Sequence, residues 1–276
     1  MLKLVTHIKP HLDDICALWL LKKFDSKFEN AEIGFVPTNH KGGEVDKDPN
    51  KTYIGVGRGK FDEHKGDLQE CSSTLVWKDL KKRGLVKDTK MEKAITYLLG
   101  WVLKEDTGKL KDIAYSNFTV PSILHGFYRI NNDDSLKLTE FGFSILDSIL
   151  YALKDIVTLE EEWKDRIEIK SKFGKAAAFE TSVFKGIDQF VYQKGFTVAI
   201  FRNTKKGYVK FKAKADSDID FTSLYKRIKK EDFCAGWYLH HSKKMLICGS
   251  ECAPNEVLSN LSFERLVKIF REEFES

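Results

Sequence analysis

The chain has 276 residues, of which 42% are hydrophobic and 32% charged, and 20 are phenylalanine. This length and composition predict a globular protein of one large or two medium domains and argue against intrinsic disorder. No apolar run approaches the roughly 18 residues of a membrane span, and the first residues have the pattern of a strand rather than of a secretory signal. Five cysteines without paired spacing indicate reduced thiols, so we expect a soluble, cytoplasmic protein with no membrane contact.

Short apolar strands alternate with helical segments in the N-terminal half. The expected strands and helix starts are, in chain order, Lys3–Val5, Asp14, Glu32–Pro37, Lys51–Val56, Ser72 and Met91. This alternation is typical of βα units, so it predicts an α/β fold built on a parallel sheet. An amphipathic helix is expected over Phe141–Ile156, and the charged run 160–166 continues it as a connector.

The first strand runs into three potential metal ligands, His7, His11 and Asp13. Residues that follow a strand lie at the carboxyl edge of an open α/β sheet, where ligands bind. Imidazole and carboxylate together suit Mn²⁺, Zn²⁺ or Fe²⁺ better than Ca²⁺. The alternative is that these residues only cap the next helix, which Asp13 or Asp14 could do.

Two later segments also end in carboxylate or imidazole groups. A glycine-rich turn after the third strand leads into Asp62, Glu63 and His64, and an apolar helix runs into Asp106. Arg58, in the same turn, is a candidate phosphate ligand, with a solvated loop as the equal alternative. Three element ends that each deliver a ligand make a shared site plausible.

A small α/β unit is expected at the C-terminus. Its predicted elements are a hairpin of Phe196–Phe201 with Tyr208–Lys214, a helix at Phe221–Lys230, strands at Trp237–His241 and Lys244–Cys248, and a helix at Phe263–Phe274. The net charge of the chain is +5, yet residues 205–244 alone hold eleven Lys/Arg against five Asp/Glu. Lys210 and Lys212 alternate with apolar residues, so they could follow a phosphate backbone or simply protect a sheet edge.

The order of these motifs resembles the DHH phosphoesterase superfamily, most closely its Myg-type exonuclease branch. The resemblance rests on His7-x-x-x-His11-x-Asp13, the triplet 62–64, the Ser-Ser that opens the next helix, and Asp106-Thr, and it extends over most of the chain. It implies a parallel-sheet DHH-type catalytic domain over 1–157, a helical connector over 158–195, and a DHH-associated substrate-binding domain over 196–276. The active site is expected in the cleft between the domains.

The resemblance also implies roles for individual residues. One ion, expected to be Mn²⁺, would be held by His7, His11 and Asp13, and a second by Asp106 with Asp13 and either Glu63 or Asp62; Mg²⁺, Zn²⁺ or Fe²⁺ would also suit. Asp62 and His64 are the expected catalytic residues, and His64 would contact the scissile phosphate. The expected substrate-binding residues are Arg58, Lys210, Lys212, His240, His241 and Lys243.

The chain departs from the family pattern at two positions. The carboxylate that bridges two ions on the middle strand of the superfamily aligns with Gly55, and the first histidine of the triplet is Glu63. The leading hypothesis is a metal-dependent phosphodiesterase, an exonuclease that releases mononucleotides from RNA or short oligonucleotides. The alternatives are a phosphatase of the same fold acting on polyphosphate, pyrophosphate or cyclic dinucleotides, and a non-catalytic RNA-binding relative whose metal site has decayed. A homodimer is left open.

Overall fold

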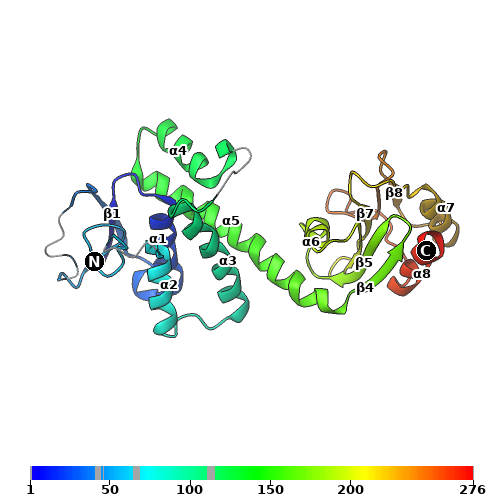
Figure 1. Cartoon of the computed structure of the whole chain (residues 1–276), viewed down its shortest axis with the longest axis horizontal. Helices are drawn as coiled ribbons and strands as arrows, with labels where there is room; N and C mark the ends of the chain where they lie inside the picture. The colour runs from blue at the N-terminus through cyan, green and yellow to red at the C-terminus, as the bar shows by residue number, and fades with distance from the viewer. Residues whose placement is uncertain (1, 41–44, 46, 65–68, 111–115, 276) are drawn as a thin grey trace. The chain divides into compact units, whose positions relative to one another are not determined.

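The computed structural model describes residues 2–40, 45, 47–64, 69–110 and 116–275. They form an α/β protein that divides into two compact units, Met1–Lys154 and Asp155–Ser276, each with its own sheet (Figure 1). Among the described residues, no helix is both long enough and apolar enough to cross a membrane.

The N-terminal unit is built on a three-stranded parallel sheet in the order β2-β1-β3. The strands are β1 (Lys3–His7), β2 (Glu32–Val36) and β3 (Lys51–Tyr53). β1 lies in the centre, and its residues from Leu4 onward are buried, as expected of an inner parallel strand. All three expected strands are therefore confirmed, and their carboxyl ends meet at one edge of the sheet.

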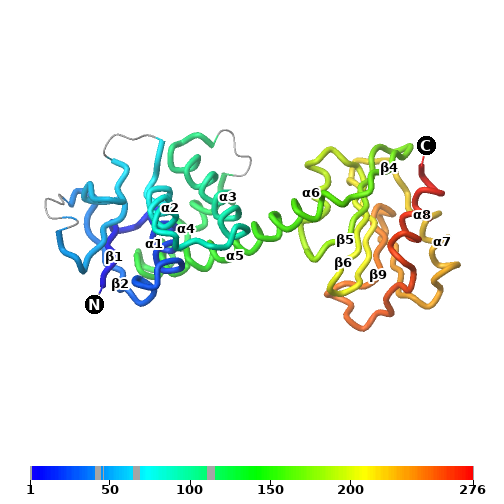
Figure 2. The backbone as a smooth tube through the Cα atoms, turned by 90° about the horizontal axis from the view of Figure 1, so that it is seen from below, coloured from blue at the N-terminus to red at the C-terminus, as the bar shows by residue number. Residues whose placement is uncertain are grey.

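Helix α1 (Leu12–Phe24) forms the centre of the helical layer of this unit. Its residues from Leu12 to Leu21 are all buried, because α2 (Ser72–Lys82) and α3 (Thr89–Asp106) pack against it. α5 (Ser135–Glu162), a long helix that continues into the C-terminal unit, approaches α1 closely at Gly142. α4 (Val120–Ile130) completes the layer (Figure 2).

The C-terminal unit contains a six-stranded mixed sheet in the order β4-β5-β6-β7-β9-β8. The strands are β4 (Ile167–Ser171), β5 (Gly174–Thr181), β6 (Val198–Asn203), β7 (Val209–Ala213), β8 (Trp237–Leu239) and β9 (Met245–Cys248). β5 and β6 are parallel, and the other neighbours are antiparallel. The hairpin expected from the sequence is the β6–β7 pair.

Helices cover both faces of this sheet, so a separate hydrophobic core lies on each face. Helices α7 (Thr222–Glu231) and α8 (Phe263–Phe274) pack on one face, where Phe211 and Phe270 are fully buried. Helix α6 (Ile187–Gln193) and the end of α5 pack on the other face, around Phe201. The expected bounds of α8 are confirmed. The helix expected at Phe221–Lys230 is α7, which begins and ends one residue later.

The helical connector expected over 158–195 is wrong for most of its length. α5 ends at Glu162, and residues 167–181 form β4 and β5, two strands of the sheet. The run Ala176–Phe179 is buried because it lies inside the sheet between β4 and β6. Alanine has a low strand propensity, so only the pairing with distant strands reveals this segment as a strand.

Candidate functional site

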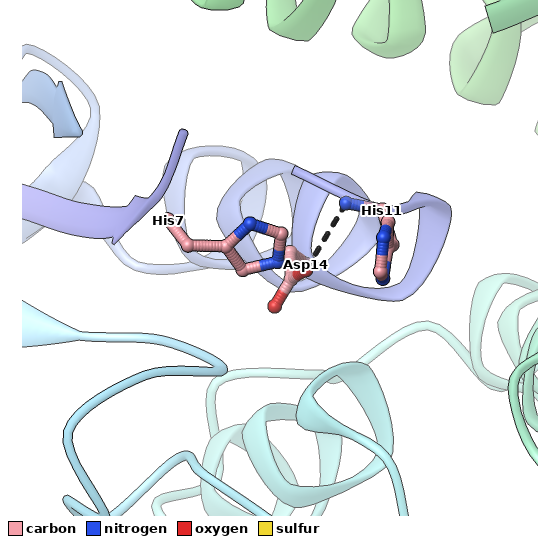
Figure 3. A group of neighbouring side chains, drawn as sticks. All are labelled: His7, His11 and Asp14. Atoms are coloured by element: carbon pink, nitrogen blue, oxygen red, sulfur yellow. Dashed lines mark hydrogen bonds and ion pairs between the residues drawn. The ribbon is translucent and has the colours of Figure 1, made fainter. Parts of the chain in front are cut away.

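A group of three side chains lies where β1 ends and α1 begins (Figure 3). His7 is the last residue of β1, His11 is the N-cap of α1, and Asp14 lies in the first turn of that helix. One possible ligand atom from each of the three lies within 4.8 Å of the other two. His7 and Asp14 are buried and His11 is exposed, so this group opens to solvent on one side.

Hydrogen bonds fix the imidazole of His7 in this group. Its Nδ1 lies 2.9 Å from the carbonyl oxygen of Ile8, to which it donates, and its Nε2 lies 2.9 Å from Oδ2 of Asp14. Burial alone would lower the pKa of His7, but the hydrogen bond and charge of Asp14 outweigh it and raise the pKa. A histidine whose Nδ1 is held by a backbone carbonyl presents Nε2 as the metal-binding atom.

Asp14 has two structural roles at this point. Its Oδ2 accepts the backbone N–H of His11 at 3.1 Å, so it caps α1 as the sequence suggests it could. Its Oδ1 lies in the space beside Gly55, where a Cβ on that residue would come within 1.7 Å of it. The carboxylate of Asp14 therefore occupies the space that a side chain at position 55 would fill.

The triplet Asp62, Glu63 and His64 forms a second group of possible ligands after the glycine-rich turn. Asp62 is buried and organises the loop: Oδ2 accepts the Arg58 backbone N–H at 2.5 Å, and Oδ1 accepts from Nδ1 of His64 at 2.8 Å. Burial disfavours a charged Asp62, but these hydrogen bonds outweigh it and lower its pKa. The side chain of His64 is 71% exposed, and the carboxylates beside it raise its pKa against the opposite effect of burial.

Ser72, the first residue of α2, connects the triplet to the group on α1. Its hydroxyl donates to Oε2 of Glu63 at 2.9 Å and lies 3.4 Å from Oδ1 of Asp14. Burial raises the pKa of Glu63, with a further contribution from the charge of Asp14. Two carboxylates therefore share one small hydroxyl donor.

The third group consists of Asp13, Cys71 and Asp106, whose possible ligand atoms also lie within 4.8 Å of one another. Asp13 is only 3% exposed, and burial together with the charges of nearby carboxylates raises its pKa well above the ordinary value. Among the described residues, no basic side chain forms an ion pair with it. Burial also raises the pKa of Asp106, at the C-terminal end of α3.

A single cavity of about 1340 Å³ brings these groups together within the N-terminal unit. Its lining includes His7, His11, Asp13, Asp14, Arg58, Asp62, Glu63, His64 and Asp106. A buried carboxylate without a cationic partner is costly, and a bound divalent cation removes that cost. Imidazole and carboxylate ligands together fit Mn²⁺, Zn²⁺ or Fe²⁺, so this donor set suits the expected ion.

The structure distributes the expected ligands differently from the sequence hypothesis. His7 and His11 lie together, but their third neighbour is Asp14, while Asp13 faces Cys71 and Asp106. Consecutive residues of a helix point about 100° apart, so Asp13 and Asp14 serve different groups. The capping role expected of Asp13 or Asp14 was the sequence signal for Asp14, whereas nothing in the spacing of the motifs pointed to Cys71.

The remaining expected substrate-binding residues belong to the C-terminal unit. The strand expected over Trp237–His241 is wrong at its end: β8 ends at Leu239, and both His240 and His241 lie in the turn that follows, with ring centroids 3.9 Å apart. Lys243, in the same turn, pairs with Asp220 at 3.1 Å.

The lysines of β7 lie on the face of the sheet that α6 covers. Lys212 forms an ion pair with Asp188 of α6, and the Nζ of Lys210 lies 5.6 Å from the ring centroid of Phe201. β7 pairs with β6 and β9, so the alternative that its lysines protect a sheet edge is wrong. Burial lowers the pKa of Lys210.

No family model matches this chain, and a search of the curated proteins found no similar sequence.

Proposed function

We propose that the N-terminal unit is the catalytic part of a divalent-cation-dependent phosphodiesterase of the DHH type that its motifs resemble. The observation that carries this proposal is the carboxylate of Asp13, buried beside other carboxylates in the cavity that also contains His7 and His11. Clusters of this kind bind cations that act on phosphate esters. The carboxylate of Asp14 beside Gly55 supports an intact site over a decayed one.

Phosphodiester hydrolysis needs an activated water, neutralisation of the phosphoryl oxygens and protonation of the leaving group. A bound divalent cation lowers the pKa of water and polarises phosphoryl oxygens. His64 is exposed to the cavity, held through Nδ1 by Asp62, and has a raised pKa, so it can donate a proton or a hydrogen bond to a phosphate. Arg58, exposed on the same cavity wall, adds a positive charge for phosphate oxygens.

The substrate we propose is RNA or a short oligonucleotide, from which mononucleotides are released. The cavity of about 1340 Å³ is larger than the roughly 300–1,000 Å³ typical of small-molecule sites. The excess of Lys/Arg over Asp/Glu in residues 205–244 gives this segment a net positive charge, which attracts polyanions. Both features favour an extended polyanion over pyrophosphate or a cyclic dinucleotide.

An assay with an end-labelled oligoribonucleotide tests this function. We expect mononucleotide release that requires added Mn²⁺ and falls at least about 100-fold in His7→Ala and in Asp106→Ala, because each removes a ligand. Asp147→Asn is the control, since Asp147 is an acidic residue of the same unit that pairs with Lys23 outside the cavity. Unchanged activity in both ligand variants would exclude this site.

Salt dependence separates the two substrate classes. Cleavage of RNA through contacts with several phosphates should weaken steeply between low and moderate salt, because bound counterions are released. Cleavage of pyrophosphate should vary little over the same range. A small substrate turned over faster than RNA, with a weak salt dependence, would favour the phosphatase alternative.

We further propose that the protein works in a reducing compartment such as the cytoplasm. All five cysteines are free, and two of them, Cys234 and Cys252, are exposed. Exposed free thiols persist where the cellular redox poise keeps them reduced.

A further inference from the structure

Cys71 is a buried thiol placed against two carboxylates of the candidate site. It is the N-cap of α2 and is fully buried. Possible ligand atoms of Cys71, Asp13 and Asp106 all lie within 4.8 Å of one another. Ligands held about 2.0–2.3 Å from one cation lie roughly 3–4.5 Å apart, so small side-chain movements would suffice to place an ion between them.

Asp13 gives independent support for a ligand at this position. Its side chain is more than nine-tenths buried, and no side chain of the described residues donates a hydrogen bond to it; the backbone N–H of Asp14 is the one donor that favours its charged form. Three further carboxyl groups, those of Asp14, Asp106 and Glu63, are near enough for their negative charges to repel that of Asp13. A cation between Asp13 and its neighbours would offset this repulsion.

The surroundings of Cys71 favour a thiolate once a cation is bound. Sγ lies 3.2 Å from the hydroxyl oxygen of Ser73, and the backbone N–H of Thr74 points to Sγ at the start of α2. A thiol that binds a metal ion gives up its proton to solvent, and these two donors would then stabilise the negative charge on the sulfur.

We propose that Cys71, with Asp13 and Asp106, is a ligand of a second divalent cation, and that its sulfur makes this position select a thiophilic ion of the Zn²⁺ or Co²⁺ class over Mn²⁺ and Mg²⁺. Thiolate ligands favour such ions, whereas all-oxygen sets favour Mg²⁺ and Mn²⁺. The inference rests on the proposed function, since it adds a ligand and a metal preference to that site. The neighbouring group of His7, His11 and Asp14 contains two imidazoles and no thiol, so it differs from this position in its ligand types.

Titration of the whole protein with Co²⁺ tests the inference, because a cobalt–thiolate bond gives a charge-transfer band in the near ultraviolet. The titration uses a Cys234→Ser/Cys252→Ser background, which removes the two exposed thiols. We expect a saturable band that Zn²⁺ abolishes and equimolar Mn²⁺ does not. Cys71→Ser should lose the band and bind Co²⁺ at least about tenfold more weakly.

Cys16→Ser is the matched control, since Cys16 is also fully buried but belongs to none of the three ligand groups. Retention of the band in this variant supports Cys71 as the ligand. Cobalt binding without a thiolate band in the background protein overturns the inference even if Cys71→Ser fails to fold. A thiolate band in a protein that cleaves no phosphodiester leaves the inference standing and rejects the proposed function, whereas the absence of any Co²⁺ binding rejects both.

Discussion

At the scale of single residues, the site is defined by carboxylates that are buried together. The folded-state pKa values of Asp13, Glu63 and Asp106 are all raised, with burial as the largest cause and other carboxylates adding to it. A group whose pKa is raised by folding stabilises the folded state at low pH, and this stability is lost as pH rises through the folded-state pKa.

The cation-free protein should therefore lose stability as pH rises. For Asp13 the loss starts above the ordinary value of 3.8 and continues through its raised folded-state pKa. Asp13→Asn should flatten this dependence and stabilise the cation-free N-terminal unit at neutral pH by about 0.5–2 kcal/mol. Thermal unfolding of the parent and of the variant between about pH 5 and pH 8 measures both the pH dependence and the stabilisation. The transition to follow is the one whose midpoint rises when Mn²⁺ is added, because it reports on the N-terminal unit. The role of Asp13 would be contradicted if stability increased with pH over this range, or if Asp13→Asn showed the same pH dependence as the parent.

Gly55 is the residue whose lack of a side chain matters most. Its φ is +62°, and a Cβ would lie 1.7 Å from Oδ1 of Asp14. Gly55→Ala should displace that carboxylate and weaken cation binding at least about tenfold, in addition to a strain of about 1–2 kcal/mol. Gly84→Ala is the control, with a φ of +67° but open space around its Cβ. Isothermal titration with Mn²⁺ should show equal affinity for the control and the parent; equal affinity for all three proteins would refute the role of Asp14.

At the scale of elements, helix packing brings the ligand-bearing segments together. α1 contributes Asp13 and Asp14, and it is held between α2, α3 and α5. The approach of α5 depends on Gly142, where a Cβ would lie 2.6 Å from Cγ2 of the buried Ile15. A β-branched side chain in a packed core has no room to move aside.

A pair of glycine variants tests this contact. Gly142→Ala should destabilise the N-terminal unit by about 1–3 kcal/mol, because overpacking outweighs the gain in helix propensity. Gly100→Ala in α3 has open space around its Cβ and should stabilise the unit by about 0.5–1 kcal/mol. Denaturant unfolding of the two variants should give changes of opposite sign. A stabilising Gly142→Ala would show that α5 does not approach α1 this closely.

At the scale of the whole molecule, the proposed metal ligands and the mixed sheet belong to different units. The three possible ligand groups found among the described residues lie in Met1–Lys154, whereas both hydrophobic cores of the mixed sheet lie in Asp155–Ser276. Val157 and Leu159, at the end of α5, are buried and fall in the second of these units. The C-terminal unit therefore contains the apolar surface that independent folding requires.

We expect a fragment of residues 155–276 to fold alone and to bind no Mn²⁺. It should show one cooperative thermal transition by circular dichroism, since it keeps the whole sheet and the last part of α5, whose residues from Ile156 onward pack on one of the two cores. The fragment 1–154 serves as the comparison and should retain Mn²⁺ binding. A C-terminal fragment without a cooperative transition would show that its cores depend on the N-terminal unit.

The sequence alone was sufficient to predict the α/β class, the parallel strands β1 to β3, the bounds of α8 and most members of the candidate site. These features are local: strands and amphipathic helices follow from apolar periodicity, and residues after a parallel strand lie at its carboxyl edge. The family-implied roles of these residues, in contrast, remain predictions for the assays above.

Tertiary structure alone decided which ligands share an ion site and which segments complete the C-terminal sheet. Cys71 lies beside Asp13, and the hydroxyl of Ser72 lies 3.4 Å from Oδ1 of Asp14, because α1 and α2 pack side by side; these residues are 58 positions apart in the sequence, and no local pattern encodes their contact. β5 is a strand because β4 and β6 pair with it, although its alanines have little preference for that conformation. The physical reason is the same in both cases: contacts between distant segments outweigh local preferences of the chain.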